Sequence, residues 1–428
     1  MNRRFWPACL GAWVIWLGIS SVSCAEPWPG WRGPRGDGTS QEQGLPTKWN
    51  GETGDGIVWK TRLAGWGHSS PIVWQDAVFV TECREEDQSR RLLRLSALDG
   101  SVVWERTVLT TPLEKRHKLN SHASGTPLTD GKKVYVSFLS PDFGSTRERT
   151  PGDLVVAAYD LDGTPRWQVR AGRFASVHGF CSSPILFEDT IIINGDHDGD
   201  GYLVALSRDT GETVWRVDRP NHTRSYVTPI IREFEGRQQL LLSGSKCVAS
   251  YDPRNGSQHW YLDGPTEQFV ASLVDNGRLV FLTAGFPDKH ILAVRPSGHG
   301  TLSDDSIVWR TTKNCAYVPS PVICGDYLLL VSDNGIASCY HADEGKLQWV
   351  SRLDTMNHSA SLVTAEGRVY FLADNGVTRV VRPGPAFEQI AANPLGEDCY
   401  ASPAISGGRL YVRGRQHLFC IGPAATGE

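Results

Sequence analysis

Residues 183–215 contain the pattern that decides the fold, and they read SPILFEDTIIINGDHDGDGYLVALSRDTGETVW. A small residue and a proline, Ser183-Pro184, precede apolar, alternating segments of the kind that favour β-strands. Gly211 then marks a predicted turn, and Trp215 follows four residues later. Glycine tolerates the positive φ angle that a tight turn requires. The stretch therefore predicts a small antiparallel sheet whose last strand carries a tryptophan.

The same pattern recurs along the chain at an average spacing of about 47 residues. Its eight starts are Ser70-Pro71, Thr126-Pro127, Ser183-Pro184, Thr228-Pro229, Ser272-Leu273, Ser320-Pro321, Ser361-Leu362 and Ser402-Pro403. The closing turns run from Gly100 to Trp104, Gly163 to Trp167, Gly211 to Trp215, Gly256 to Trp260 and Gly345 to Trp349. Repeat five has a longer turn before Trp309, and repeat seven has Phe387 in place of tryptophan. Repeat eight ends at Ile421 without a closing strand.

The incomplete last repeat indicates how the chain closes. Residues 56–63 precede repeat one but have the composition of a closing strand, with Trp59 as its tryptophan. One four-stranded sheet cannot bury both of its faces, whereas a ring of stacked sheets buries them and leaves no open end. The sequence predicts an all-β, eight-bladed β-propeller of four-stranded blades over residues 56–422, closed by strand 56–63 pairing with the last blade. Residues 26–55 form an N-terminal segment, and residues 423–428 a tail.

Residues 1–25 are expected to be a targeting segment that is not part of the fold. Two arginines near the start, an apolar stretch over residues 8–19 and small residues at 23–25 are typical of a signal peptide. The apolar stretch is too short for a membrane span, so a transmembrane protein is not expected. A lipid anchor at Cys24 is the less favoured alternative, because Ser21 lies where an aliphatic residue is normally found. The predicted location is the periplasm or the exterior.

Composition narrows the classes of partner and of covalent bond. A formal net charge of -4 and a pI near 6.3 disfavour a nucleic-acid partner. Apart from Cys9 and Cys24, eight cysteines remain, and an exported chain can form disulfides from them in 105 ways. Most lie in strand-like runs, where cysteines are commonly small buried hydrophobes. Disulfide pairing stays open, and a monomer is expected.

The residues just before each innermost strand should meet at one mouth of the central channel. Histidines and aromatic residues are frequent at this position, where a generic linker would favour small polar residues. We interpret them as a polar-aromatic pocket for a ligand or a peptide. The alternative is that these side chains only fill the narrow neck and bond loop backbone. The candidate binding residues are His68, His122, His178, Arg224, Tyr226, Gln268, Tyr317, His358, Asp398 and Tyr400.

The repeat quoted above also contains an Asp-x-Asp-x-Asp-Gly run formed by Asp196, Asp198 and Asp200. Alternating carboxylates in a loop can wrap a hard cation, so the run is a candidate calcium site. The residue at position twelve is Ser207 instead of glutamate, and strand-like runs flank the loop. A plain acidic hairpin turn is therefore the favoured interpretation.

Three further features could contribute contacts. Arg224 could pair with Glu267 across adjacent blades, or it could hold an anionic ligand in a bidentate manner. Lys246 is predicted either in the channel or in solvent. Residues 140–152 form a long polar insertion in repeat two, which serves as a partner-contact loop or as an idle loop.

These repeats resemble the quinoprotein-type propeller repeat of pyrroloquinoline quinone (PQQ) dehydrogenases and of the outer-membrane assembly propeller BamB. The start of the mature chain, residues 28–38 together with residues 44–49, resembles a group of secreted PQQ-like propeller proteins of planctomycetes. The resemblance covers residues 28–422 and implies the fold, with activity left open. In the dehydrogenases, adjacent cysteines, a stacking tryptophan, a calcium ion held by Glu and Asn, and a catalytic Asp surround PQQ. This sequence has no adjacent cysteine pair, and the Glu/Asn/Asp set cannot be placed on it.

Motifs for hydrolysis and nucleotide binding are absent, including Gly-x-Ser-x-Gly, His-Glu-x-x-His and Gly-x-x-x-x-Gly-Lys. We therefore expect an exported, non-catalytic binding or scaffolding module, with an envelope protein or a small ligand at the channel mouth. Assembly of envelope proteins is the version that the BamB resemblance implies. No catalytic residue is assigned and no cofactor is firmly predicted. The alternative is an oxidoreductase that uses PQQ and calcium, and polysaccharide binding or lysis is a third hypothesis that rests on the aromatic mouth alone.

Overall fold

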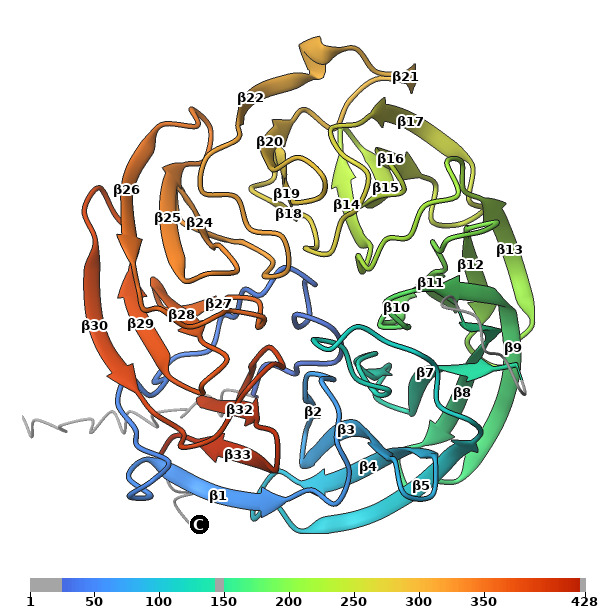
Figure 1. Ribbon diagram of the computed structural model, residues 1–428, viewed down its shortest axis with the longest axis vertical. Coiled ribbons are helices and arrows are strands. Elements are labelled where there is room, and N and C mark those ends of the chain that lie inside the picture. Colours follow the sequence, from blue (N-terminus) through green and yellow to red (C-terminus); the bar gives the residue numbers. More distant parts are fainter. Residues whose placement is uncertain (1–24, 143–149, 424–428) are drawn as a thin grey trace, which may run out of the picture.

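A computed structural model describes residues 25–142 and 150–423, and in this part of the chain it contains eight sheets arranged in a ring (Figure 1). Each sheet is a blade whose first strand lies nearest the axis and whose last strand lies at the rim. The predicted all-β, eight-bladed fold of four-stranded blades is confirmed. The predicted signal peptide lies outside the described residues except for Ala25, as do the tail from residue 424 and the insertion residues 143–149.

Blade 1 contains β2 (Ile72–Trp74), β3 (Ala77–Arg84), β4 (Ser89–Ser96) and β5 (Val102–Thr110), and blade 2 contains β6 (Leu128–Thr129), β7 (Lys133–Pro141), β8 (Thr150–Asp160) and β9 (Pro165–Ser176). Blade 3 contains β10 (Ile185–Phe187), β11 (Thr190–Asn194), β12 (Tyr202–Ser207) and β13 (Thr213–Asp218), and blade 4 contains β14 (Ile230–Phe234), β15 (Arg237–Gly244), β16 (Cys247–Tyr251) and β17 (Gln258–Asp263). Blade 5 contains β18 (Val274–Asp275), β19 (Val280–Ala284), β20 (His290–Val294) and β22 (Ile307–Thr311), and blade 6 contains β23 (Val322–Cys324), β24 (Tyr327–Val331), β25 (Ile336–His341) and β26 (Leu347–Arg352). Blade 7 contains β27 (Val363–Ala365), β28 (Arg368–Leu372), β29 (Thr378–Arg382) and β30 (Glu388–Asn393), and blade 8 contains β31 (Ala404–Ser406), β32 (Arg409–Arg413), β33 (His417–Ile421) and β1 (Ile57–Arg62).

The ring closes as the incomplete last repeat predicted. Strand β1, from the N-terminal part of the chain, pairs antiparallel with β33 of blade 8 and becomes its outermost strand. Trp59 on β1 is buried and lies opposite Cys420. Figure 1 shows β1 beside β33 at the rim, next to β4 and β5 of blade 1. The two ends of the propeller sequence are thereby held in one sheet.

The repeated tryptophans connect six of the blades to the next one. Six indole N–H groups donate to a backbone oxygen of the following blade: Trp59 to Ala97 (3.1 Å), Trp104 to Leu161 (3.0 Å), Trp167 to Arg208 (3.1 Å), Trp215 to Pro253 (3.1 Å), Trp309 to Ala342 (2.7 Å) and Trp349 to Gly384 (3.1 Å). The glycine of the next turn packs under the indole ring. Gly211, with φ 78°, lies so close to Trp167 that an added Cβ would be 2.7 Å from the ring. This position requires glycine for its positive φ and for the space that the indole occupies.

The small residues that begin the repeats connect the blades at their inner ends. Backbone N–H groups donate to the hydroxyl of the next start in five places: Ser70 to Thr126 (3.1 Å), Thr126 to Ser183 (3.0 Å), Ser272 to Ser320 (2.9 Å), Ser320 to Ser361 (3.0 Å) and Ser361 to Ser402 (2.9 Å). All of these residues are buried. Buried N–H groups need such partners, which explains why serine or threonine occupies these positions.

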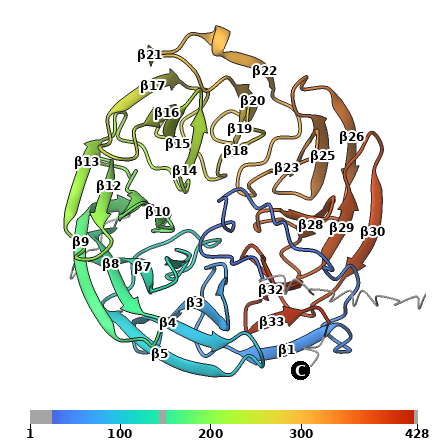
Figure 2. The ribbon, with the colours of Figure 1, turned by 180° about the vertical axis from the view of Figure 1, so that it is seen from behind.

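The N-terminal segment crosses the axis of the ring on the face shown in Figure 2. Trp28 exchanges two 2.8 Å backbone hydrogen bonds with Val73 of blade 1, and Thr364 of blade 7 donates its N–H to Gly38 at 2.8 Å. Between them, the guanidinium of Arg32 is buried and donates to the backbone oxygens of Pro321 and Leu362. The segment therefore connects blade 1 with blades 6 and 7 and covers one end of the channel.

Candidate functional site

A cavity of about 550 Å³ lies where the loops before the innermost strands meet, above the crossing segment. Its floor includes Trp31 of that segment, whose indole N–H donates to Ser272 Oγ at 3.1 Å. Seven of the ten predicted binding residues line this cavity: His68, His178, Arg224, Tyr226, Gln268, Tyr317 and Tyr400. Because the loops before the innermost strands all face the axis, residues from all eight blades meet here. The structure thus brings these seven side chains together around one space.

One wall is formed by the loops that begin blades 3 and 4. Tyr226 is buried, and its hydroxyl lies 2.8 Å from Nδ1 of His178 and 2.9 Å from Oγ of Ser176. Burial and then the nearby charge of Arg224 lower the pKa of His178, so its imidazole is neutral near pH 7. Arg224 is ion-paired with Asp198, and not with Glu267 as one interpretation proposed. Its Nε–H is buried without a hydrogen-bond partner among the described residues.

The loops of blades 8 and 1 form a second, aromatic wall. The rings of His68 and Tyr400 are 4.8 Å apart at an interplanar angle of 31°, and the ring of Trp66 packs edge-on against His68 at 5.1 Å. Burial, followed by the charges of Arg413 and Arg116, lowers the pKa of His68 to about 3. His68 is therefore neutral at physiological pH, and its Nε2 has no hydrogen-bond partner in the described structure.

A third wall comes from blades 5 and 6 and contains a residue that sequence reasoning missed. Tyr317 donates its hydroxyl hydrogen to Oε1 of Gln268 at 3.2 Å. The backbone N–H groups of Tyr317 and Val318 donate to the two carboxylate oxygens of Asp333, at 3.1 and 2.9 Å. Asp374 has the same role one blade later, where its carboxylate accepts the N–H of Ser359 at 2.7 Å. Burial raises the pKa of Asp374, with a contribution from Asp398.

A repeated signal in the sequence could have identified these carboxylates. Asp333 and Asp374 each begin an Asp-Asn-Gly triplet in the hairpin of blades 6 and 7. His117, Phe286 and Trp31 also line the cavity and were not predicted. They lie outside the positions just before the innermost strands, so the repeat pattern carries no signal for them.

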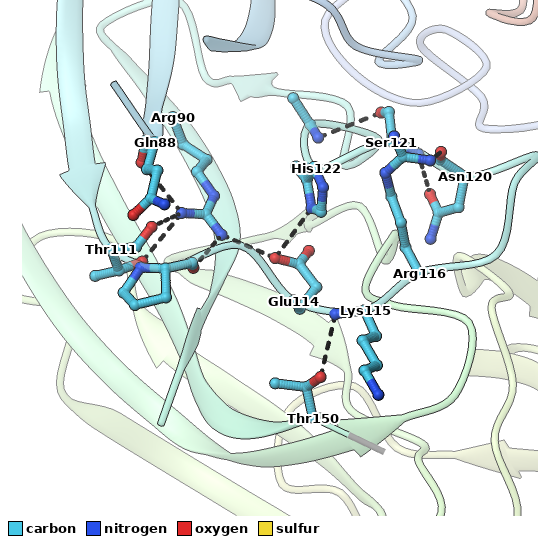
Figure 3. A network of polar contacts seen from close by, with 12 residues as sticks. Gln88, Arg90, Thr111, Glu114, Lys115, Arg116, Asn120, Ser121, His122 and Thr150 are labelled. Atoms are coloured by element: carbon cyan, nitrogen blue, oxygen red, sulfur yellow. Dashed lines mark hydrogen bonds and ion pairs between the residues drawn. The ribbon is translucent and has the colours of Figure 1, made fainter. Parts of the chain in front are cut away.

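Three predicted residues do not line the cavity. The side chain of His122 is only 7% exposed, and its Nδ1 lies 3.2 Å from Oε2 of Glu114, which is itself paired with the buried Arg90 at 2.8 Å (Figure 3). His358 is fully buried, with Nε2 3.4 Å from Asp354. Asp398 is exposed, and its backbone oxygen accepts the N–H of Arg415. His122 and His358 are thus internal structural groups.

The candidate calcium residues have separate basic partners. Asp196 is buried and pairs with Arg219 at 3.0 Å, Asp198 pairs with Arg224, and the exposed Asp200 lies 3.3 Å from His222. In residues 25–142 and 150–423, no group of three or more His, Cys, Asp or Glu side chains is placed to hold a metal ion. The structure does not gather the three carboxylates into one ligand set.

Neither the described cysteines nor Lys246 supplies a reactive group to the cavity. All eight cysteines of the described chain are free thiols, and six of them are buried. Burial raises the pKa of Cys181, which lines the cavity, to about 12, so its thiol is not a ready nucleophile. Lys246 lies outside the cavity, 3.7 Å from Glu267. Among the described residues, no helix combines the length and the apolar character needed to cross a membrane.

Comparison with solved structures identifies the architecture. BamB from Moraxella catarrhalis matches with a TM-score of 0.59 and 12% identity, over 87% of this chain and 98% of that one. Quinohemoprotein alcohol dehydrogenase from Comamonas testosteroni matches with a TM-score of 0.66 and 12% identity, over 94% and 81%. At such identities, the likeness concerns the fold alone.

Sequence comparison gives a narrower result. The outer membrane protein assembly factor BamB of Yersinia pestis is 22% identical over 296 residues, which are 66% of this chain and 64% of that protein. The match therefore spans slightly less than two thirds of the curated relative. The sequence model described as outer membrane protein assembly factor BamB matches residues 39–147, 116–298 and 288–383. Because these matches cover more than half of the chain, the protein belongs to this family of PQQ-like β-propellers.

Proposed function

We propose that the protein is a non-catalytic binding module of the cell envelope that holds an envelope protein or a small ligand in the axial cavity. The observation that carries this proposal is the cavity itself, which is covered at one end and lined mainly by aromatic and uncharged side chains. A volume of about 550 Å³ is within the range of ordinary ligand pockets.

The state of the ionisable groups supports a binding role over a catalytic one. The carboxylate of Asp333 accepts two backbone hydrogen bonds, and the guanidinium of Arg224 is paired with Asp198. His178 is hydrogen-bonded to Tyr226. A general base or nucleophile needs an accessible, activated group, and these groups are engaged in holding the walls.

Family membership supports an envelope location, since the matched relative is an outer-membrane assembly factor. The predicted signal peptide is consistent with this location. Transfer of the relative's role is itself part of the proposal, because function resides in sites and one fold serves many.

The alternative is an oxidoreductase with PQQ on the axis, which the fold likeness to a quinohemoprotein dehydrogenase favours. The described residues do not fit the calcium site that accompanies PQQ in the dehydrogenases that the repeats resemble. Asp333 is the one carboxylate in the described cavity lining, and its oxygens are occupied by backbone N–H groups.

Two measurements test the proposal. Native mass spectra of the purified chain with PQQ and calcium should show no stoichiometric mass gain, and quinone-dependent dye reduction should be absent. In cells that export the protein, a photo-crosslinking residue at position 400, in the cavity wall, should capture a discrete partner. The same residue at position 350, exposed on β26, should not capture it. Dye reduction dependent on PQQ, or equal capture at both positions, would refute the proposed function.

A further inference from the structure

The floor of the axial cavity is a ring of hydroxyl groups with unused donors. Ser183, Ser320, Ser361 and Ser402, which we call the serine ring, line the cavity. Each of their hydroxyl oxygens accepts one backbone N–H from the preceding blade. Within the described chain, none of these four hydroxyl hydrogens is donated to a protein acceptor. A hydroxyl carries one donor as well as two lone pairs, so four O–H groups remain available to a bound molecule.

The walls above this floor carry flat aromatic rings. Tyr400 and His68 form one surface of two tilted rings 4.8 Å apart, Tyr317 and Tyr226 face the cavity from other blades, and Trp31 lies at the bottom. His68 and His178 are neutral imidazoles, which can both donate and accept hydrogen bonds. The cavity therefore combines aromatic faces with hydrogen-bonding groups of mixed character.

The charges in the cavity are already balanced by the protein. The lining contains one cation-bearing arginine, Arg224, which is paired with Asp198, and one carboxylate, Asp333, which is held by two backbone N–H groups. A strongly anionic or cationic ligand would enter without a free counter-charge among the described residues and would lose its hydration. The lining thus favours an uncharged, hydroxyl-rich molecule.

We propose that the axial cavity binds the end of a neutral carbohydrate chain, with its sugar ring against Tyr400 and His68 and its oxygens on the serine ring. This inference rests on the proposed function, because it names the ligand class for the same site. Sugar rings have apolar C–H faces that pack on aromatic rings, and hydroxyl edges that both donate and accept. The covered floor limits the site to the terminal units of the chain.

The test is calorimetric titration of the purified chain with maltotriose, cellotriose and chitotriose, with trigalacturonate as the charged comparison. At least one neutral trisaccharide should bind with a stoichiometry of one and with a dissociation constant below ~1 mM, the value of a weak specific ligand. Tyr400→Ala should weaken this binding at least about 10-fold, whereas Tyr400→Phe keeps the ring and should keep most of the affinity. Tyr327→Ala is the matched control, because Tyr327 is a half-buried tyrosine of blade 6 outside the cavity.

The serine ring has a control of its own. Ser361→Ala removes a link between blades and also a donor to the cavity, and should weaken binding about 5-fold. Thr126→Ala removes the same kind of link, but Thr126 does not line the cavity. It should lower thermal stability similarly and leave sugar affinity unchanged, which separates loss of the donor from loss of the link.

The outcomes distinguish this inference from the proposed function. Absence of binding by every neutral trisaccharide at ~10 mM, preference for trigalacturonate, or equal weakening by the control variants would each overturn the carbohydrate assignment. If the crosslink at position 400 still captures an envelope protein, the proposed function stands without it. A stoichiometric gain of PQQ with dye reduction would overturn both.

Discussion

The contact between blades 1 and 2 and the contact between blades 4 and 5 connect equivalent positions of the repeat in different ways. At the first, Trp104 donates directly to Leu161 of blade 2, and the N–H of Ser70 donates to Thr126. At the second, the indole of Trp260 donates to Gln239 of its own blade at 2.8 Å. The amide of Gln239 then donates to Pro296 of the blade 5 insertion at 2.9 Å.

The inserted turn of repeat five accounts for this difference. It contains β21 (Gly300–Thr301) and the short 3-10 helix η1 (Asp304–Ser306), and β21 pairs parallel with β17 as a fifth strand of blade 4 (Figure 1). The turn that would receive Trp260 is thereby displaced, and a buried glutamine relays the hydrogen bond across the gap. At this contact, the irregular repeat therefore satisfies the indole N–H with a residue outside the repeat pattern.

The contact between blades 1 and 2 has an additional ionic component, and breaking it should have the largest effect. Arg90 is fully buried and pairs with Glu114, which is also beside His122 (Figure 3). Glu114→Gln leaves the guanidinium without its counter-charge and should lower the free energy of unfolding by about 3–5 kcal/mol. Chemical denaturation measures this loss. A change below about 1 kcal/mol, typical of an exposed pair, would contradict the assignment.

The stabilisation supplied by Glu114 should decrease as the pH falls. Burial tends to raise the pKa of Glu114, but the hydrogen bond with His122 and the charges of His122 and Arg90 outweigh it, so the pKa lies below 4.5. The stabilisation is therefore fully present above about pH 4.5 and is lost as pH falls through the lower folded-state value. In Glu114→Gln this part of the acid-induced loss should disappear, which denaturation curves between pH 3 and 7 would show as a flatter profile.

Breaking the relay between blades 4 and 5 should have the next largest effect. Gln239→Leu removes the acceptor of Trp260 and Ser250 and the donor to Pro296, all in a buried position. Unpaired buried polar groups cost about 1–3 kcal/mol each, so we expect a loss of about 3 kcal/mol. Trp215→Phe, at the direct contact with Pro253, removes a single hydrogen bond and should cost about 1 kcal/mol. Equal losses in the two variants would show that the relay has no special weight.

The regular parts of the molecule could be predicted from the sequence because the residues within each repeat determine its strands and turns. The eight starts, the glycine turns and the closing strand with Trp59 all depend on local pattern, and they were found at the expected places. The relay through Gln239 could not be predicted, because its partners Trp260 and Pro296 are brought together only by the folded ring. The same limit applies to Arg32, whose partners Pro321 and Leu362 are far away in the sequence.

The candidate site shows the same division. Residues such as Tyr226, Tyr317 and Tyr400 were found because their place in the repeat fixes their distance from the axis. His122 and His358 have the same place in the repeat but turn into the protein, where Glu114 and Asp354 lie beside them. Periodicity predicts where a backbone lies, whereas the direction of a side chain depends on the neighbours it finds there.

A smaller loss of stability than that of Gln239→Leu should come from substituting Gly211, at a regular contact between blades, or Gly300, in the inserted turn. Gly211 has a φ of 78° and lies under the ring of Trp167, where an added Cβ would be 2.7 Å from the nearest ring atom. Gly300 on β21 has a φ of 66° and open space around it. Gly211→Ala combines backbone strain with overpacking and should cost about 2–3 kcal/mol. Gly300→Ala meets only the backbone strain and should cost about 1 kcal/mol. Thermal unfolding of the two variants isolates the packing contribution, because the conformational cost is common to both. If Gly300→Ala were as destabilising as Gly211→Ala, the indole–glycine contact would not be what holds the regular blades together.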